Sequence, residues 1–396
     1  MLDGSALPAD GRLAGRASSS GPLKEIRRKV REKGAITFAE FMRLALYMDG
    51  EGYYTAGRAR WGEAGDYVTN VDISPVFAKL IAKELNEMWI ALGSPESFTL
   101  IEAGAGRGLL SKGIRKAADE LYRGFADALD LKLVELNPDT SEPLPPGSSW
   151  HRSLDEIASP VSGCILSNEL IDSFPVHRVI GTGDGGIKEL YVALDGDSFK
   201  EVPGEPSTGM LSWYMDRFGI RLEAGQKAEV NLAAIDWIRK VARLLDKGFV
   251  FTIDYGLPGK ELYQSGRCGS LICHHRHTVN DNPFVNIGAQ DITTHADFTA
   301  LKETGEEEGL RLTGFTTQKN FLLGLGIAGE LKEISGEGPL AFEDIALNRS
   351  IGLLINPGGA GETFKVLIQH KGIERPELSG FSFRDMGKYL SSGPRF

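Results

Sequence analysis

The sequence contains few cysteines and no long hydrophobic run. Its cysteines, Cys164, Cys268 and Cys273, are too few for a disulfide framework in a chain of 396 residues, and this favours a reducing compartment. No apolar stretch is long enough for a transmembrane helix, and no signal-peptide core is present. We therefore expect a protein without membrane insertion, located in the cytoplasm of a bacterium or, in a eukaryote, in the mitochondrial matrix.

An excess of positive charge is also missing. Lysine and arginine number 44 against 54 aspartates and glutamates, which gives a formal net charge of -10. This balance argues against nucleic acid or an anionic membrane as the main partner. It is compatible with a basic protein or peptide substrate. A Ser-His-Asp order and a nucleophile elbow are absent as well, so the sequence gives no support to acyl transfer.

The most informative segment is 98–110, with the sequence FTLIEAGAGRGLL. It reads as an apolar strand, an acid (Glu102) and three glycines (Gly104, Gly106 and Gly108), followed by an apolar pattern at helical spacing. This order is typical of the first unit of a nucleotide-binding α/β domain. The pyrophosphate fingerprint is not met, because Leu109 stands where its third glycine belongs. The segment therefore favours S-adenosylmethionine, whose methionine end carries positive charge, and leaves an NAD-dependent oxidoreductase as the weaker alternative.

Polar side chains stand at the ends of three further predicted strands. They are Glu135 (strand 131–137), Asn168, Glu169 and Asp172 (strand 163–171), and Asp254 (strand 249–256). Because the carboxyl ends of parallel strands share one rim, we expect these side chains to gather there. Glu135 is the expected partner of two ribose hydroxyls, since one carboxylate accepts two hydrogen bonds. The alternative is that such acids cap the following helix or face water.

The pattern of the chain predicts several parts. Residues 1–21 read as a disordered leader, and 22–97 as a helical N-terminal extension with a lid loop. Helices are expected to begin at the capping box Thr37-x-x-Glu40 and at Ser74-Pro75. The core should comprise 98–180 and 231–372, interrupted by an insertion at 181–230 with a hairpin near Gly196. We expect 351–372 to form an antiparallel hairpin that closes the sheet, and 373–396 to be a C-terminal tail.

The segment 267–298 is rich in histidine, with four of the seven histidines and two of the three cysteines. A structural zinc site usually needs two paired ligand arms, which this segment lacks, so we expect no metal. Its polar residues are expected to form a network near the pocket or, alternatively, a satisfied loop network without chemistry. These residues are Arg276, His277, Gln290, Asp291, Thr293 and Asp297.

Several separated segments together resemble the MidA/NDUFAF7 family of S-adenosylmethionine-dependent methyltransferases, which is related to mitochondrial complex I assembly. In order they are GYYTAG, GDYVTNVDISPVFAKLIA, FTLIEAGAGRGLL, SNELIDSFPV, FTIDYG, HHRHTVNDNP, DITTHADF and GETFKVLIQ. The resemblance extends over about residues 24–372. It implies an α/β fold: a class I methyltransferase (Rossmann-like) core with a helical N-terminal extension and an inserted α+β subdomain.

The resemblance also implies a cofactor site for S-adenosyl-L-methionine. Gly104, Gly106 and Gly108 would cradle the cofactor, with Glu102 at its amino-acid end and Glu135 on its ribose. Asn168 and Thr69 complete the expected cofactor-binding set. Asp66 and Thr69 would border the entrance for cofactor or substrate.

The segment SNELIDSF (167–174) resembles the first half of the acidic loop of arginine methyltransferases that dimethylate symmetrically. Glu169 matches the first acid of that loop, and two acids can hold both sides of a guanidinium. The position of the second acid is occupied by Arg178, which leaves arginine specificity open unless Asp172 or a distant acid replaces it. Glu169 and Asp172 are the expected catalytic residues.

The resemblance implies a methyltransferase that acts on a protein side chain, with arginine the leading candidate. The expected partner is a protein substrate such as a respiratory-complex subunit, without nucleic acid and with the oligomeric state open. The alternative is a cofactor-binding assembly factor with little or no methyl transfer.

Overall fold

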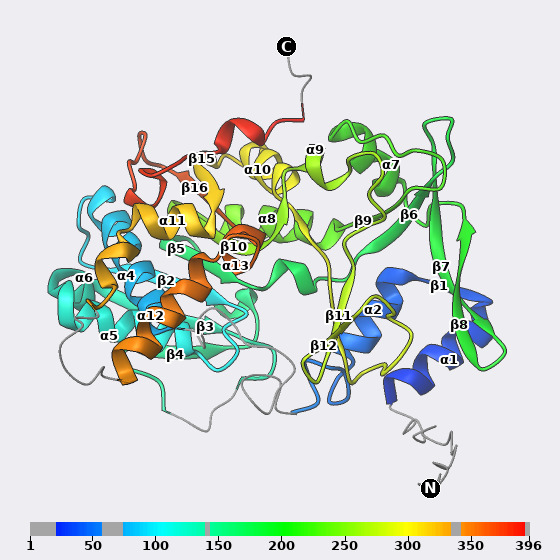
Figure 1. Cartoon of the computed structure of the whole chain (residues 1–396), viewed down its shortest axis with the longest axis horizontal. Coiled ribbons are helices and arrows are strands. Elements are labelled where there is room, and N and C mark those ends of the chain that lie inside the picture. Colours follow the sequence, from blue (N-terminus) through cyan, green and yellow to red (C-terminus); the bar gives the residue numbers. More distant parts are fainter. Residues whose placement is uncertain (1–20, 58–73, 139–142, 334–341, 393–396) are drawn as a thin grey trace, which may run out of the picture.

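The computed structural model describes residues 21–57, 74–138, 143–333 and 342–392 (Figure 1). The expected leader, apart from its last residue, lies outside these ranges. Asp66 and Thr69 lie outside them too. The two helix starts predicted from sequence are confirmed. The hydroxyl of Thr37 accepts a hydrogen bond from Glu40 N (3.1 Å) at the start of α2 (Phe38–Tyr47), and that of Ser74 from Val76 N (3.3 Å) at the start of α4 (Pro75–Ala91).

Within the described residues, eight strands form the large sheet, in the order β15-β16-β10-β5-β2-β3-β4 with β14 beside β10. The strands are β2 (Phe98–Ala103), β3 (Leu129–Val134), β4 (Ser148–His151), β5 (Val161–Asn168), β10 (Leu245–Leu257), β14 (Ala296–Asp297), β15 (Arg311–Thr317) and β16 (Phe364–Lys371). All neighbours are parallel except β16, which is antiparallel to β10 and β15. This mostly parallel sheet, with helices on both faces, confirms the expected class I α/β fold.

Helices cover both faces of the large sheet, so its central strands are buried on both sides. In β2, Leu100 belongs to one apolar cluster and the next residue, Ile101, to the other. The first cluster includes residues of α4, α5 (Leu109–Leu121), α6 (Arg123–Ala128), α11 (Gln318–Gly324) and α12 (Phe342–Ile355). The second includes residues of α8 (Leu232–Leu244) and α10 (Phe298–Glu307). This packing leaves the strand ends as the place for a site.

The prediction of an antiparallel strand pair within 351–372 was wrong for the first of the two strands. Residues 342–355 form α12, and the antiparallel partner of β16 at this edge is β15. A short apolar run such as IGLLI (351–355) is compatible with a strand or a helix when judged by pattern alone. The helix is stabilised because Ile351 and Leu354, three residues apart, are both buried against the core. A short 4-residue helix, α13 (Ala360–Thr363), then leads into β16.

A second sheet, drawn at the right of Figure 1, has the order β1-β7-β6-β9 with β8 beside β7. Its strands are β1 (Ala35–Thr37), β6 (His177–Gly181), β7 (Ile187–Asp195), β8 (Ser198–Gly204) and β9 (Lys227–Val230). The turn between β7 and β8 is the predicted hairpin at Gly196. The N-terminal part, expected to be helical, contributes the edge strand β1, in which Ile36 pairs with Val192. Three residues are too few to show the period of a strand in the sequence.

The remaining elements connect these sheets. They are α1 (Gly21–Lys33), α7 (Gly209–Arg217), α9 (Gly259–Leu262), a small sheet of β11 (Ile272–His275), β12 (Thr278–Asn280) and β13 (Asp291–Thr293), and the 3-10 turns η1 (Leu154–Glu156), η2 (Ile171–Ser173), η3 (Ile327–Glu330), η4 (Ser379–Phe381) and η5 (Gly387–Tyr389). The C-terminal segment lies against the core, since Ser379 N donates to Glu87 (2.7 Å) and Met386 N to Phe315 O (2.6 Å). None of the described helices combines the length and the apolar character needed to cross a membrane.

Candidate active site

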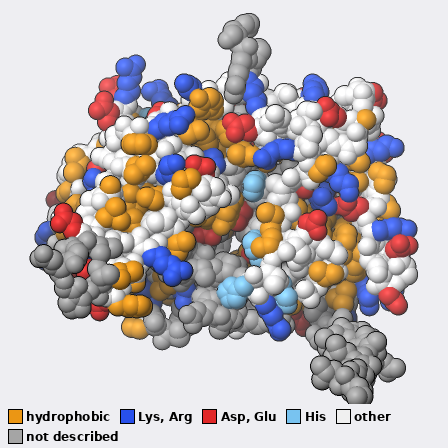
Figure 2. All heavy atoms as spheres, in the orientation of Figure 1, with side chains coloured by type: hydrophobic (Ala, Val, Ile, Leu, Met, Phe, Trp, Pro, Cys, Tyr) orange, Lys and Arg blue, Asp and Glu red, His pale blue; other side chains and the backbone are white. Residues whose placement is uncertain are grey.

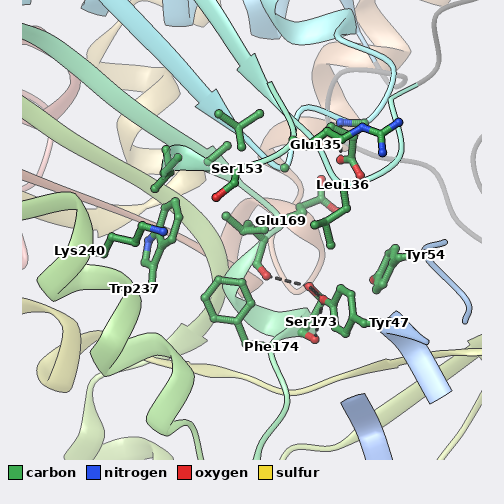
Figure 3. A pocket seen from close by; sticks show the side chains of 17 residues that line it. Tyr47, Tyr54, Glu135, Leu136, Ser153, Glu169, Ser173, Phe174, Trp237 and Lys240 are labelled. Carbon is green, nitrogen blue, oxygen red and sulfur yellow. Dashed lines mark hydrogen bonds between the residues drawn. The ribbon is translucent and has the colours of Figure 1, made fainter. Parts of the chain in front are cut away.

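A cavity of about 290 Å³ opens at the carboxyl ends of β2, β3, β4 and β5 (Figure 3). Residues that directly follow these strands line it, among them Gly104, Gly106, Glu135, Ser153 and Glu169. The strand-end side chains predicted to gather at one rim are thus brought together in part. Glu102, Gly108, Asn168 and Asp172 are close in sequence to the lining, and Asp254 bonds to its Leu170, but none of these five is part of it.

The glycine loop depends on left-handed backbone geometry. Gly104, Gly106 and Gly108 have φ values of 72°, 53° and 69°, which side chains rarely tolerate. A Cβ atom on Gly104 would lie 2.9 Å from Leu170 Cδ1, and one on Gly108 would lie 2.7 Å from Leu133 Cδ2. A side chain at any of these positions would be strained, and at Gly104 or Gly108 it would also displace a leucine side chain. The loop is left free to present its backbone to a ligand.

Glu135 fixes the loop and also faces the cavity. Its Oε2 accepts a hydrogen bond from Gly106 N (3.0 Å), and its Oε1 accepts one from Asn137 N (3.3 Å). A carboxylate has about four acceptor sites, so capacity for a ligand remains. Glu135 is placed where a diol beside the glycine loop could donate to it.

Glu102 is buried behind the loop, with 5% of its surface exposed. Its Oε2 accepts hydrogen bonds from the backbone N (3.1 Å) and the hydroxyl of Ser111, in the first turn of α5. This contact is the helix-capping alternative considered for strand-end acids. Burial raises the pKa of Glu102 to about 7, although the two bonds from Ser111 act in the opposite direction.

This shift predicts a pH dependence of stability. Because the pKa of Glu102 is raised above its ordinary value of 4.5, the folded protein holds this proton more firmly than the unfolded chain does. The resulting stabilisation is present below about pH 4.5 and is lost as the pH rises through about 7. Between pH 5 and pH 8, we expect wild type to lose on the order of 2 kcal/mol more unfolding free energy than Glu102→Gln. Urea unfolding at both pH values measures the difference.

All other titrating groups are shared by these two proteins, so the difference isolates Glu102. Glu120→Gln, an exposed change near the end of α5, serves as the control and should follow wild type. Parallel pH profiles for wild type and Glu102→Gln would contradict the raised pKa.

Glu169 stands in an unusual backbone conformation at the end of β5. Its φ is 54°, which is uncommon for a residue with a side chain, and its N donates to Ile253 O (3.0 Å). Asn168 Nδ2 lies 3.3 Å from Glu169 Oε1. Strained residues of this kind concentrate at functional sites, where the surrounding structure holds them in place.

Asp254 supplies much of that support. Its Oδ2 accepts hydrogen bonds from Ile171 N (2.8 Å) and Leu170 N (3.2 Å), and its Oδ1 accepts one from Tyr255 N (2.8 Å). The Asp254 side chain is fully buried, and burial raises its pKa to about 7. The acid at the end of β10 therefore shapes the turn that presents Glu169.

Asp172 is part of the same turn, within η2, and does not line the cavity. It is 5% exposed, and burial, together with the nearby Asp254, Asp291 and Glu169 carboxyls, raises its pKa well above the usual range. Its backbone O accepts a hydrogen bond from Thr294 N (2.9 Å). Asp172 thus connects the turn to the segment that follows β13.

Aromatic residues that we did not single out individually as site residues line the cavity. The rings of Tyr47 and Tyr54 stack at 5.3 Å, and Tyr54 OH donates to Asp291 Oδ1 (2.8 Å). At the other end of the cavity the rings of Phe174 and Trp237 meet edge to face at 6.0 Å. Figure 3 shows the two tyrosines and this pair on different sides of Glu169. The signal for Trp237 was its position off the apolar stripe of α8, formed by Ile235, Ile238, Val241 and Ala242.

Arg178 is absent from the cavity lining. It lies on β6, where its guanidinium pairs with Glu201 and with Glu229 (3.2 Å) and covers the ring of Phe38 at 5.5 Å.

The polar residues of 267–298, predicted to form one network, take part in different contacts. Asp291 reaches the tyrosines of the cavity, whereas Asp297 caps α10 by accepting from Ala300 N (3.0 Å). In the described ranges, no three His, Cys, Asp or Glu side chains gather closely enough to hold a metal ion.

Comparison with known families decides the class of protein. Residues 80–316 match the model of a family described as "Putative S-adenosyl-L-methionine-dependent methyltransferase". The chain belongs to this family. A crystal structure of a "likely methyl transferase" from Burkholderia thailandensis bound to S-adenosyl-homocysteine is similar to it. The TM-score is 0.83 and the identity 30%, over 97% of this chain and 100% of that one.

Curated relatives extend the similarity over most of the chain. The Drosophila melanogaster protein "Protein arginine methyltransferase NDUFAF7 homolog, mitochondrial" is 26% identical, over 92% of this chain and 88% of the relative. The human "Protein arginine methyltransferase NDUFAF7, mitochondrial" is also 26% identical, over 89% and 84%. The resemblance to the MidA/NDUFAF7 family is confirmed. This protein is an S-adenosylmethionine-dependent methyltransferase, and the glycine-rich loop beside the Glu135 carboxylate fits that cofactor.

Proposed function

We propose that the protein transfers the methyl group of S-adenosylmethionine to an arginine side chain of a protein substrate. The observation that carries this proposal is the Glu169 carboxylate, which lines the cofactor cavity and is held there by the turn that Asp254 fixes. A fixed carboxylate beside a sulfonium is suited to a cationic acceptor, whose charge it balances. The names of the curated relatives support arginine as that acceptor.

In this proposal the cofactor lies along the strand ends. Gly104 and Gly106 receive its methionine part, Glu135 accepts hydrogen bonds from the ribose, and the apolar side chains of Leu136 and Leu154 enclose the adenine. Gly108 and Glu102 act indirectly, because they shape the loop and the start of α5. Asn168 acts through its contact with Glu169 Oε1. Thr69 keeps its proposed place at the entrance, although it lies outside the described residues.

The cofactor supplies an electrophilic methyl group, and its sulfur leaves as a neutral thioether. The nitrogen of the acceptor forms the new bond and afterwards loses one proton to solvent. Glu169 needs only to hold the guanidinium so that this nitrogen is in line with the methyl group. Asp172, with its raised pKa and its place in the turn outside the cavity lining, serves as a positioning residue for Glu169 and not as a second ligand of the guanidinium.

The remaining parts of the proposal concern partner and compartment. The family resemblance supports a protein substrate such as a subunit of a respiratory complex, and the net charge of -10 disfavours nucleic acid. Unpaired cysteines fit a bacterial cytoplasm or a mitochondrial matrix. Cys164 and Cys273 are buried, so the fold itself keeps them apart from oxidants.

The test is methyl transfer into a lysate from a strain that lacks the protein. Purified protein and S-adenosylmethionine with an isotope-labelled methyl group are added, and labelled peptides are identified by mass spectrometry. We expect label on arginine of few proteins, and labelling that is slower by about 100-fold or more with Glu169→Gln. Label on another residue type would contradict arginine specificity. No label, together with intact binding of S-adenosyl-homocysteine, would favour the alternative of a cofactor-binding assembly factor.

A further inference from the structure

A second cavity, of about 930 Å³, lies beside the second sheet and is about three times as large as the cofactor cavity of about 290 Å³. Its walls are formed by Arg178 of β6, Glu201 of β8 and Lys227 of β9 on one side. Segments 267–272 and 281–284 form the other side, with His295 at one end. The two cavities share no lining residue. The second cavity is therefore separate from the place proposed for the cofactor.

The end of this cavity at His295 is close to the turn that carries Glu169. His295 follows Thr294, whose N donates to Asp172 O (2.9 Å) in that turn. The next residue, Ala296, pairs with Gly256 at the end of β10, two residues after Asp254. Since β10 is the neighbour of β5, His295 lies beside the strand ends from which Glu169 projects. A chain bound in the second cavity could thus reach the acceptor side of the active site.

Polar groups at this end have unused hydrogen-bonding capacity. His295 Nδ1 is buried and has no hydrogen-bond partner among the described residues, and the same holds for Thr294 Oγ1. Burial and the nearby cations Arg267 and Lys365 lower the pKa of His295 to about 4, so its ring is neutral at pH 7. Buried polar atoms are normally paired. Of the two residues only His295 lines the cavity, so a peptide bound there could supply the partner that its ring lacks.

Some of the charged side chains in the cavity wall form ion pairs, and others do not. Arg178 and Lys227 both pair with Glu201, the latter at 2.7 Å. In contrast, within the part of the chain that the structure describes, the Arg267 and Asp281 side chains form no ion pair or hydrogen bond, and both are exposed. The apolar Leu271 and Phe284 lie between polar residues of the wall. This mixture of side chains suits an extended polypeptide that carries an acidic side chain for Arg267 and a basic side chain for Asp281.

Figure 2 shows one face of the molecule. Histidine side chains gather over the middle of this face, between the part that holds the large sheet and the part that holds the second sheet. Cationic, anionic and apolar side chains alternate around them.

We propose that the second cavity binds the stretch of the acceptor protein next to the methylated residue, and that Arg267 pairs with an acidic side chain of that stretch. The identity of the occupant rests on the proposed function. The cavity would then determine which arginines are brought to Glu169. Selection of the substrate would be separated in space from binding of the cofactor.

The test uses a library of peptides with a central arginine and randomised flanking positions. Full-length protein saturated with S-adenosyl-homocysteine is incubated with the library, and the retained peptides are sequenced. We expect wild type to enrich Asp or Glu at one flanking position at least about fivefold, and Arg267→Glu to lose that preference or to favour Lys or Arg there. Arg384→Glu, an exposed change of equal charge in the C-terminal segment, should behave as wild type.

Cys268 offers a second, independent measurement. It lines the cavity beside Arg267 and is exposed, whereas Cys164 and Cys273 are buried, so a bulky maleimide can modify it selectively. Modification should weaken peptide retention at least about tenfold and leave the affinity for S-adenosyl-homocysteine unchanged. The Cys268→Ser variant, treated in the same way, should retain peptides normally.

Two results would overturn the proposal: no acidic enrichment by wild type, or unchanged retention after modification of Cys268. Methylation of the retained peptides is measured separately with labelled S-adenosylmethionine. Enriched peptides that are bound but never methylated on arginine would contradict the proposed function and still support the cavity as a binding site. The two proposals can therefore fail independently.

Discussion

We expect the Glu169→Gln variant to bind S-adenosyl-homocysteine as tightly as wild type and to transfer methyl groups about 100-fold to 1,000-fold more slowly. Glutamine keeps the shape of the side chain at the cavity wall and removes its charge. The loss of one preorganised electrostatic group at a reacting centre typically costs about 3–4 kcal/mol of barrier, which corresponds to that range. Single-turnover transfer to the labelled acceptor measures the rate, and calorimetry measures the affinity.

The backbone at this position allows a sharper control. Glu169 has a φ of 54°, a left-handed conformation that costs a residue with a side chain about 1–2 kcal/mol. Glycine adopts the same conformation without this cost. Glu169→Gly should therefore be as stable as wild type or more stable, and yet inactive. Arg375→Gly, at a φ of 39° in the C-terminal segment, should leave activity unchanged. Transfer by Glu169→Gln at the wild-type rate would contradict the role of the carboxylate.

Removal of the Glu135 carboxylate should have the largest effect on cofactor binding. In Glu135→Ala we expect the Kd for S-adenosyl-homocysteine to rise at least about 100-fold. Each hydrogen bond to a charged group contributes about 1.5–3 kcal/mol, and the ribose would lose two of them. The mutation also removes the acceptor of Gly106 N, so the glycine loop loses an anchor. Isothermal calorimetry with the full chain gives the Kd directly.

A matched pair of variants separates these two contributions. Glu135→Gln can still accept from Gly106 N and should show a smaller loss of affinity than Glu135→Ala. Glu96→Ala, an exposed change in the loop before β2, should bind as wild type does. An unchanged Kd in Glu135→Ala would exclude Glu135 from the cofactor site.

Much of the sheet could be predicted because its signals are local. The apolar run that ends in Glu102 predicts a strand, and the three glycines after it predict a loop, in which they adopt positive φ values that glycine readily allows. The helix starts at Thr37 and Ser74 could be predicted for the same reason, because a capping side chain contacts its own first turn.

The parts that could not be predicted depend on distant contacts. Asp254 supports Glu169 through amides that lie 83 and 84 residues away in the sequence. In the sequence, Arg178 takes the position of the second acid of the arginine-methyltransferase loop. In the fold, it lies on β6 and pairs with Glu201 and Glu229. The strand at 35–37 forms because the edge of β7 offers hydrogen bonds to it. A run of three residues is too short to indicate a strand in the sequence. Pairings between residues so far apart in the sequence can be recognised only in the three-dimensional structure.

The long-range pairing of the N-terminal part has a consequence for synthesis on the ribosome. Ile36 finds its partner Val192 only after the chain has grown by 156 residues, and Tyr54 must wait for Asp291, 237 residues later. Because β16 joins the sheet between β10 and β15, the large sheet is complete only after residue 371 has been added. The first helices of the nascent chain must therefore stay available for these pairings until residues 192 and 291 have been made.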